Sequence, residues 1–143
     1  MQARADQLAA LLQRGLKPLY LVHGDEPLLA QEACDLIRAS ARAAGFDERK
    51  VFNVSGAHFD WSSVLGAAQE MSLFAQRQLI EIRIPSGKPG KEGSEALQRY
   101  VEHLSGDVLT ATYFTGATGT IEDKSIASED QPRLTVFTRA NGE

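Results

Sequence analysis

The apolar residues of the chain first recur at a helical spacing. Leucines three and four positions apart predict an amphipathic helix over residues 4–14, which ends at Gly15. A continuous apolar run follows at residues 19–22, and a strand without polar positions is typical of a parallel sheet covered on both faces. Gly24 then begins a turn into a second helix, for which Asp25 is the expected cap.

The second helix is predicted to bury one stripe of side chains and to stop at Gly45. Its stripe comprises Leu29, Ala33, Leu36 and Ile37. A strand over residues 50–55 comes next, and Asp60 is placed to cap a short helix that starts at Trp61.

Residues 78–84 give the clearest strand signal. Isoleucines at every second position alternate with Glu81 and Arg83, which predicts one buried face and one face in water. A helix over residues 94–104 and strands over 108–114 and 134–138 complete the pattern. Strands that alternate with helices predict an α/β fold, with a parallel sheet flanked by helices.

The composition is that of one ordinary globular domain, with 143 residues of which 43% are hydrophobic and 24% charged. The net charge of −4 argues against nucleic-acid binding over the whole surface. Cys34 is the sole cysteine, which excludes an internal disulfide and a four-cysteine zinc site. His23, His58 and His103 have no ligand spacing, so no metal is expected. No apolar run reaches the length of a membrane span and no secretory signal is visible, so we expect a cytoplasmic location.

A strand, a glycine turn and a helix in succession form the place where nucleotide phosphates commonly bind. The phosphate-loop motif would begin here at Gly24. Leu29 stands where the motif has its second glycine, and its side chain occupies the place where phosphate needs bare backbone. Ala30 replaces the lysine and removes the positive charge, and Gln31 replaces the hydroxyl residue that would bind magnesium. The degenerate loop comprises Gly24, Asp25, Glu26, Pro27, Leu29, Ala30 and Gln31. No nucleotide cofactor is expected, and an ordinary strand-to-helix turn is the alternative interpretation.

A hydrophobic hexapeptide, Gln69-Glu70-Met71-Ser72-Leu73-Phe74, precedes the strand at residues 78–84. Leu73 and Phe74 are adjacent, so a regular strand cannot direct both into the core. Near a helix end the two side chains can instead project as a plug for a partner's pocket, and burying each would stabilise a complex by roughly 1.5–3 kcal/mol. The alternative is that the pair belongs to the domain's own core.

Residues 19–29, Leu-Tyr-Leu-Val-His-Gly-Asp-Glu-Pro-Leu-Leu, closely resemble the opening of the bacterial DNA polymerase III delta subunit family. Further landmarks follow in the family's order and spacing over residues 16–105. They are Val51-Phe52, Phe59-Asp60-Trp61, Met71-Ser72-Leu73-Phe74 and residues 84–93, Ile-Pro-Ser-Gly-Lys-Pro-Gly-Lys-Glu-Gly.

The resemblance implies an AAA+-like domain that neither binds nor hydrolyses ATP. Such a domain is not catalytic itself, although it belongs to a subunit of the DNA polymerase III holoenzyme, a nucleotidyltransferase complex of DNA replication. In the family, the residues that match Leu73 and Phe74 enter a hydrophobic pocket on the beta sliding clamp. The remaining clamp-binding candidates are Gln69, Met71 and Ser72.

Through this contact the domain is implied to help open the clamp ring for loading onto primed DNA. The other implied partners are the clamp-loader subunits gamma/tau and delta prime, and ATP binding by neighbouring loader subunits would control access to the hexapeptide. DNA is expected to be contacted indirectly or weakly, with Arg77, Arg83 and Lys88 as candidates. The alternative function is that of a P-loop-like nucleotide-binding α/β enzyme with an unusual phosphate loop.

The resemblance weakens from about Gly106. Threonines interrupt the apolar run at residues 108–114, residues 115–120 have loop composition, and residues 121–131 are polar and acidic. We therefore assign residues 1–105 to the delta-type AAA+-like domain and residues 106–143 to an atypical C-terminal segment of the same domain. A truncated chain or an altered reading frame past Gly106 would account for this composition.

Overall fold

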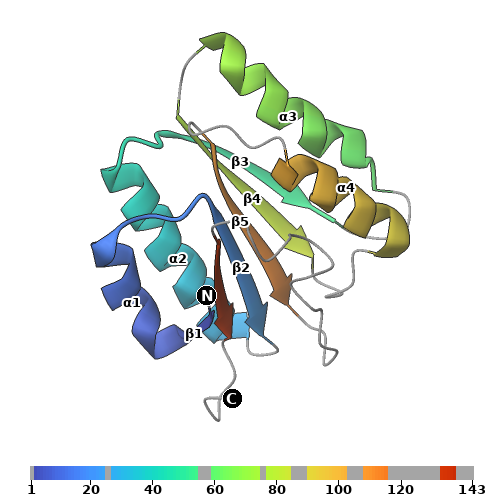
Figure 1. The fold of residues 1–143 in the computed structure, drawn as a ribbon. Coiled ribbons are helices and arrows are strands. Elements are labelled where there is room, and N and C mark those ends of the chain that lie inside the picture. The colour runs from blue at the N-terminus through green and yellow to red at the C-terminus, as the bar shows by residue number, and fades with distance from the viewer. Residues whose placement is uncertain are drawn as a thin grey trace.

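The computed structural model describes residues 2–24, 27–54, 59–74, 77–84, 90–102, 108–115 and 133–137 (Figure 1). From residue 5 to residue 115 helices and strands alternate, as the sequence predicted, whereas the short strand at residues 2–4 was not predicted. In chain order the elements are β1 (Gln2–Arg4), α1 (Ala5–Arg14), β2 (Leu19–Gly24), α2 (Pro27–Ala43), β3 (Glu48–Asn53), α3 (Trp61–Phe74), β4 (Gln78–Ile84), α4 (Gly90–Glu102), β5 (Val108–Thr115) and β6 (Arg133–Phe137).

The described strands form one sheet with the order β1-β6-β2-β5-β4-β3, and every pairing is parallel. This confirms the predicted α/β fold with a parallel sheet flanked by helices. Consecutive parallel strands require a crossover that returns the chain, so α2, α3 and α4 run against the strands they join. The C-terminal ends of α1, α2 and α3 therefore all lie toward the amino-terminal edge of the sheet (Figure 1).

The two faces of the sheet are covered by different helix pairs. Helices α1 and α2 pack on one face, and α3 and α4 pack on the other (Figure 1). On β2, Leu19 and Leu21 join the core beneath α3 and α4, whereas Tyr20 and Val22 join the core beneath α1 and α2. The continuous apolar run at residues 19–22 is explained by this double cover, as predicted.

Two expectations about exposure were wrong. Glu81 was expected to face water, but its side chain is fully buried, because α2 covers that face of β4. Leu36 was assigned to the buried stripe of α2, but it is 39% exposed, while Ala33 and Ile37 are buried.

The segment after residue 106 contributes two regular strands. The strand expected over residues 108–114 is β5, and the one expected over 134–138 is β6. Thr110 and Thr112 of β5 are buried, and the Thr110 hydroxyl lies 2.6 Å from the Tyr100 hydroxyl of α4. This buried hydrogen bond gives the Thr110 hydroxyl a partner inside the core.

Candidate functional site

The hexapeptide belongs to α3, whose first half is firmly anchored. Asp60 caps the helix as predicted, since its Oδ1 accepts a hydrogen bond from the Ser62 backbone N–H at 3.1 Å. One stripe of α3 is buried against the sheet, and it comprises Trp61, Val64 and Ala67. The Phe59 ring packs edge-on against Trp61 with ring centroids 5.0 Å apart. The helix axis is therefore fixed before the hexapeptide begins.

Residues 69–74 form the last turns of α3, at the amino-terminal edge of the sheet (Figure 1). A helical backbone places neighbouring positions 73 and 74 about 100° apart around the axis. The side chains of residues 68–76 lie outside the described part of the structure. The exposed Leu73–Phe74 plug, with Gln69, Met71 and Ser72 beside it, consequently stays a prediction.

The anchored stripe nevertheless orients the end of the helix. Val64 is the middle of that stripe. Position 73 follows Val64 by nine residues, which at about 100° per residue places it on the opposite side of the helix. Position 71 falls in line with the stripe, and position 74 lies about 80° round from it.

The segment predicted to be a degenerate phosphate loop connects a strand to a helix, as expected. β2 ends at Gly24 and α2 begins at Pro27, whereas Asp25 and Glu26 lie outside the described residues. The position of the phosphate-binding lysine holds Ala30, which is buried. Gln31 at the next position is exposed, and its amide donates a hydrogen bond to Asp35 of the same helix at 3.0 Å. Leu29, at the position of the second glycine, is half-buried.

The DNA-contact candidates are not brought together. Arg77 precedes β4 and Arg83 lies near its other end, so the length of a strand, about 20 Å, separates them. Lys88 lies outside the described residues. The Arg77 guanidinium donates to the Ala44 carbonyl at 2.9 Å and lies 5.4 Å above the Phe46 ring.

A buried ionic cluster was missed by the sequence analysis. The Glu81 carboxylate, on β4, forms ion pairs with Arg38 of α2 at 2.9 Å and with Arg49 of β3. The Cys34 thiol also donates to it at 3.0 Å. Burial acts to raise the pKa of Glu81, but the hydrogen bonds from Arg38, Cys34 and Arg49 outweigh burial and hold the pKa below its usual value.

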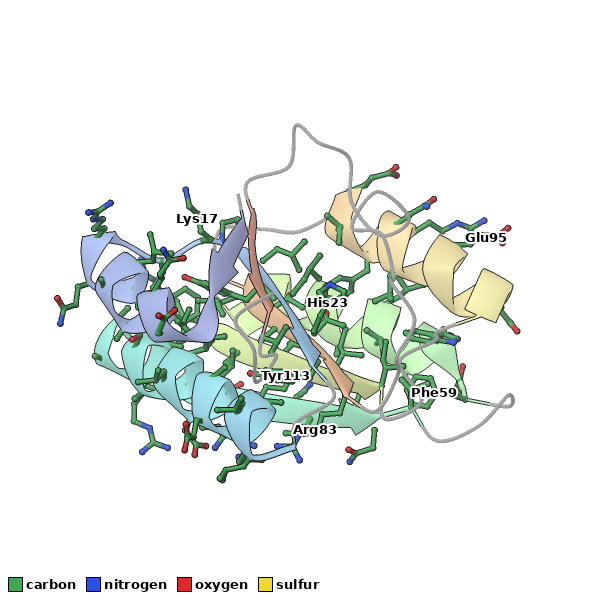
Figure 2. The ribbon with its side chains drawn as sticks, turned by 90° about the horizontal axis from the view of Figure 1, so that it is seen from below. Lys17, His23, Phe59, Arg83, Glu95 and Tyr113 are labelled. Atoms are coloured by element: carbon green, nitrogen blue, oxygen red, sulfur yellow. The ribbon has the colours of Figure 1, made fainter. Side chains whose placement is uncertain are left out.

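The same buried surroundings shift the pKa of Cys34. Burial, followed by the hydrogen bond to Glu81, raises the pKa of the Cys34 thiol to about 11. Figure 2 shows the side chains on both faces of the sheet, and Tyr113 of β5 belongs to the core that α1 and α2 cover. The cluster ties α2, β3 and β4 together and is best explained as part of the framework.

Among the residues that the structure describes, no group of three or more His, Cys, Asp or Glu side chains is placed to hold a metal ion. His23 lies on β2, and His58 and His103 fall outside the described ranges. In the same ranges, none of the helices has the length and apolar character needed to cross a bilayer.

Comparison with a solved structure gives the class of protein first. The fold is similar to that of the DNA clamp loader delta protein of Bacillus subtilis, with a TM-score of 0.66 over 94% of this chain and 42% of that chain. The sequence identity is 17%, so this likeness shows the fold. The chain is thus an α/β domain with the fold of a clamp loader delta protein.

Sequence comparison then gives the family. The family model of DNA polymerase III, delta subunit, matches residues 20–118. The DNA polymerase III subunit delta of Escherichia coli (strain K12) is 38% identical over 104 residues, which cover 73% of this chain and 30% of that protein. The DNA polymerase III subunit delta of Haemophilus influenzae is 32% identical over 104 residues, which again cover 73% of this chain and 30% of that protein. The chain belongs to the DNA polymerase III delta subunit family, and it spans less than a third of the length of these relatives.

Proposed function

We propose that this chain is the clamp-binding domain of a DNA polymerase III delta subunit. Leu73 and Phe74 bind a hydrophobic pocket on the beta sliding clamp, and the domain thereby helps to open the ring for loading onto primed DNA. Gln69, Met71 and Ser72 complete the contact, Met71 by supporting the end of α3 from the side that is in line with the buried stripe. The observation that carries the proposal is the end of α3, which lies at the sheet edge with position 73 opposite the buried stripe.

The expected binding free energy of the two side chains is consistent with a plug that enters a pocket. Transfer of two large apolar side chains from water into a pocket stabilises a complex by roughly 1.5–3 kcal/mol each, which is the range of interface hot spots. Binding alone does not open a ring. The domain shifts the ring toward its open form only by as much as it binds that form better than the closed one.

The proposed domain is AAA+-like, cytoplasmic and without nucleotide chemistry of its own. The buried Ala30 replaces the lysine that a phosphate loop requires, and the Gln31 amide is engaged by Asp35. ATP binding by neighbouring loader subunits would control access to the plug. The rival function, a nucleotide-binding enzyme, requires magnesium-dependent binding tighter than millimolar, which a titration with ATP or GTP measures directly.

The test of the plug is the variant Leu73→Ala with Phe74→Ala. We expect its affinity for purified beta clamp to fall roughly a hundredfold or more, since two hot-spot side chains are lost. The circular dichroism spectrum and the unfolding midpoint should stay near those of the unaltered chain. Leu28→Ala is the matched control, because Leu28 is 69% exposed on α2. Unchanged affinity of the double variant would exclude the plug, and its unfolding would assign the pair to the core.

A further inference from the structure

Arg77 joins the segment that follows α3 to the end of α2, which belongs to the opposite helix layer. Arg77 directly precedes β4, and only two residues separate it from Phe74, the last residue of α3. Its guanidinium Nη1 donates a hydrogen bond to the Ala44 carbonyl at 2.9 Å. Because α2 and α3 cover different faces of the sheet, this side chain links the exit of the hexapeptide to the other layer (Figure 1).

The C-terminal cap of α2 presents the carbonyl that the guanidinium binds. The Phe46 backbone N–H donates to the Ala41 carbonyl at 3.0 Å. The Gly45 N–H donates to the Arg42 carbonyl at 3.1 Å, and Gly45 has a φ of 96°, the left-handed conformation that commonly ends a helix. The cap thus satisfies two of the last carbonyls of α2, and the Ala44 carbonyl accepts from the guanidinium instead.

Further contacts hold the Arg77 side chain in this position. The guanidinium lies 5.4 Å above the ring of Phe46, which is itself half-buried against the core. The Arg77 Cδ and Nη1 lie 3.8 Å from the point where a Cβ of Gly45 would stand, so the side chain passes close to that glycine. A cation is also favoured there because the C-terminal end of a helix carries a partial negative charge. Arg77 is exposed, but its side chain is fixed by these contacts.

The alternation of side chains along β4 explains why Arg77 reaches α2. Positions 77, 79 and 81 share one face, on which Leu79 joins the core beneath α1 and α2 and Glu81 pairs with α2. Gln78 lies on the other face, and among the residues that the structure describes its buried amide has no hydrogen-bond partner. Of the two described residues at this junction, Arg77 is therefore the one whose side chain ties the chain to a neighbouring element.

We propose that Arg77 is a positioning residue for the clamp contact, which fixes the exit from α3 and thereby the direction in which Leu73 and Phe74 project. This inference rests on the proposed function. The buried stripe anchors the first half of α3, and Arg77 anchors the chain within roughly 11 Å of Phe74, the longest span of three residues. A last turn that is held from both directions loses less conformational freedom on entering a pocket, which strengthens binding.

The experiment compares Arg77→Ala with Arg42→Ala in the 143-residue chain. Arg42 is the matched control, because it is an exposed arginine in the last turn of α2 and its removal changes the net charge equally. We expect Arg77→Ala to weaken binding of purified beta clamp about fivefold, since the last turn of α3 must then be ordered on binding. The midpoint of thermal unfolding should fall by at most about 4 °C, the scale of one exposed interaction. Amide hydrogen exchange of residues 72–74 should become faster than in the control.

A second background distinguishes positioning from direct contact with the clamp. If Arg77 acts through the end of α3, its removal costs less once Leu73 is gone. The fivefold loss of affinity should therefore shrink to about twofold in the Leu73→Ala chain. An equal loss in both backgrounds, or weaker binding without faster exchange, would mean that Arg77 touches the clamp itself, and the inference would be overturned.

The remaining outcomes separate this inference from the plug. If Arg77→Ala binds the clamp as its control does, while Leu73→Ala with Phe74→Ala does not bind, the positioning role is excluded and the proposed function stands. If both of these variants bind normally, both proposals fail. An unfolding midpoint that falls by more than about 10 °C in Arg77→Ala would assign the residue to the stability of the whole fold, which also overturns the inference.

Discussion

The Arg38 guanidinium of α2 lies 2.9 Å from the Glu81 carboxylate of β4, whose side chain is wholly buried. The second oxygen of that carboxylate pairs with Arg49 of β3. One charged group in the interior therefore holds a helix to two strands. Burying a carboxylate is costly unless cations and hydrogen bonds replace water, and both arginines and the Cys34 thiol do so here.

We predict that Glu81→Gln destabilises the fold by about 3 kcal/mol, the lower end of the range for breaking a buried ion pair, because both arginines retain some solvent contact. Denaturant unfolding measures the change. Glu95→Gln on α4 is the matched control, since Glu95 is exposed. A variant as stable as the control would show that the pair contributes nothing net.

The same residue should make stability depend on acid. The pKa of Glu81 is lower in the folded protein than its usual value near 4, so its contribution is fully present above the unfolded pKa and is lost as pH falls through the folded pKa. We expect the difference in unfolding free energy between the unaltered chain and Glu81→Gln to be constant above about pH 5 and to shrink below about pH 4. A constant difference down to pH 3 would contradict the assignment.

Cys34 should be inert in the folded chain. Burial and the contact with Glu81 raise the pKa of its thiol to about 11, and the reactive species is the thiolate. At pH 8 we expect a disulfide reagent to label the native protein far more slowly than the protein in denaturant. Because this is the sole cysteine, the labelled fraction measures one site. Equal rates in both states would mean that the α2–β4 contact opens readily.

The sequence predicted the elements well where local patterns decide them. The apolar run at residues 19–22 indicated a doubly covered strand, and β2 is one. The alternation of apolar and charged residues on β4 was misleading. A charged residue between isoleucines is expected both on a face exposed to water and on a face where the charge is buried in an ion pair. The partners of Glu81 are 43 and 32 residues away in the chain, so no local spacing reveals them.

The residue types of the hexapeptide indicated where the candidate site lies in the sequence. They did not show which of its residues face the sheet and which face away from it. Only the buried stripe of Trp61, Val64 and Ala67 shows which side of α3 faces the sheet. A surface hollow lined by Leu12, Phe46 and Arg77 left no signal in the sequence, because its lining comes from the end of α1, the end of α2 and the segments that follow them, and the residue before β4. Such surfaces depend on tertiary packing, which is set by contacts far apart in the sequence.

The orientation of α3 predicts that Met71 and Leu73 of the hexapeptide behave differently. Position 71 falls in line with the buried stripe, whereas position 73 lies on the opposite side of the helix. Met71→Ala should therefore destabilise the fold by about 2 kcal/mol, as truncation of a packed side chain does. Leu73→Ala should change stability by less than about 0.5 kcal/mol, as at exposed positions, and should weaken clamp binding at least tenfold.

Two measurements on each variant decide the matter, namely the free energy of unfolding in denaturant and the affinity for the beta clamp. Leu28→Ala again serves as the exposed control, because it truncates a leucine on α2 that is 69% exposed. A Leu73→Ala variant that loses stability as strongly as Met71→Ala would place Leu73 in the core. The plug would then have to consist of Phe74 alone, a single side chain worth at most about 3 kcal/mol of binding.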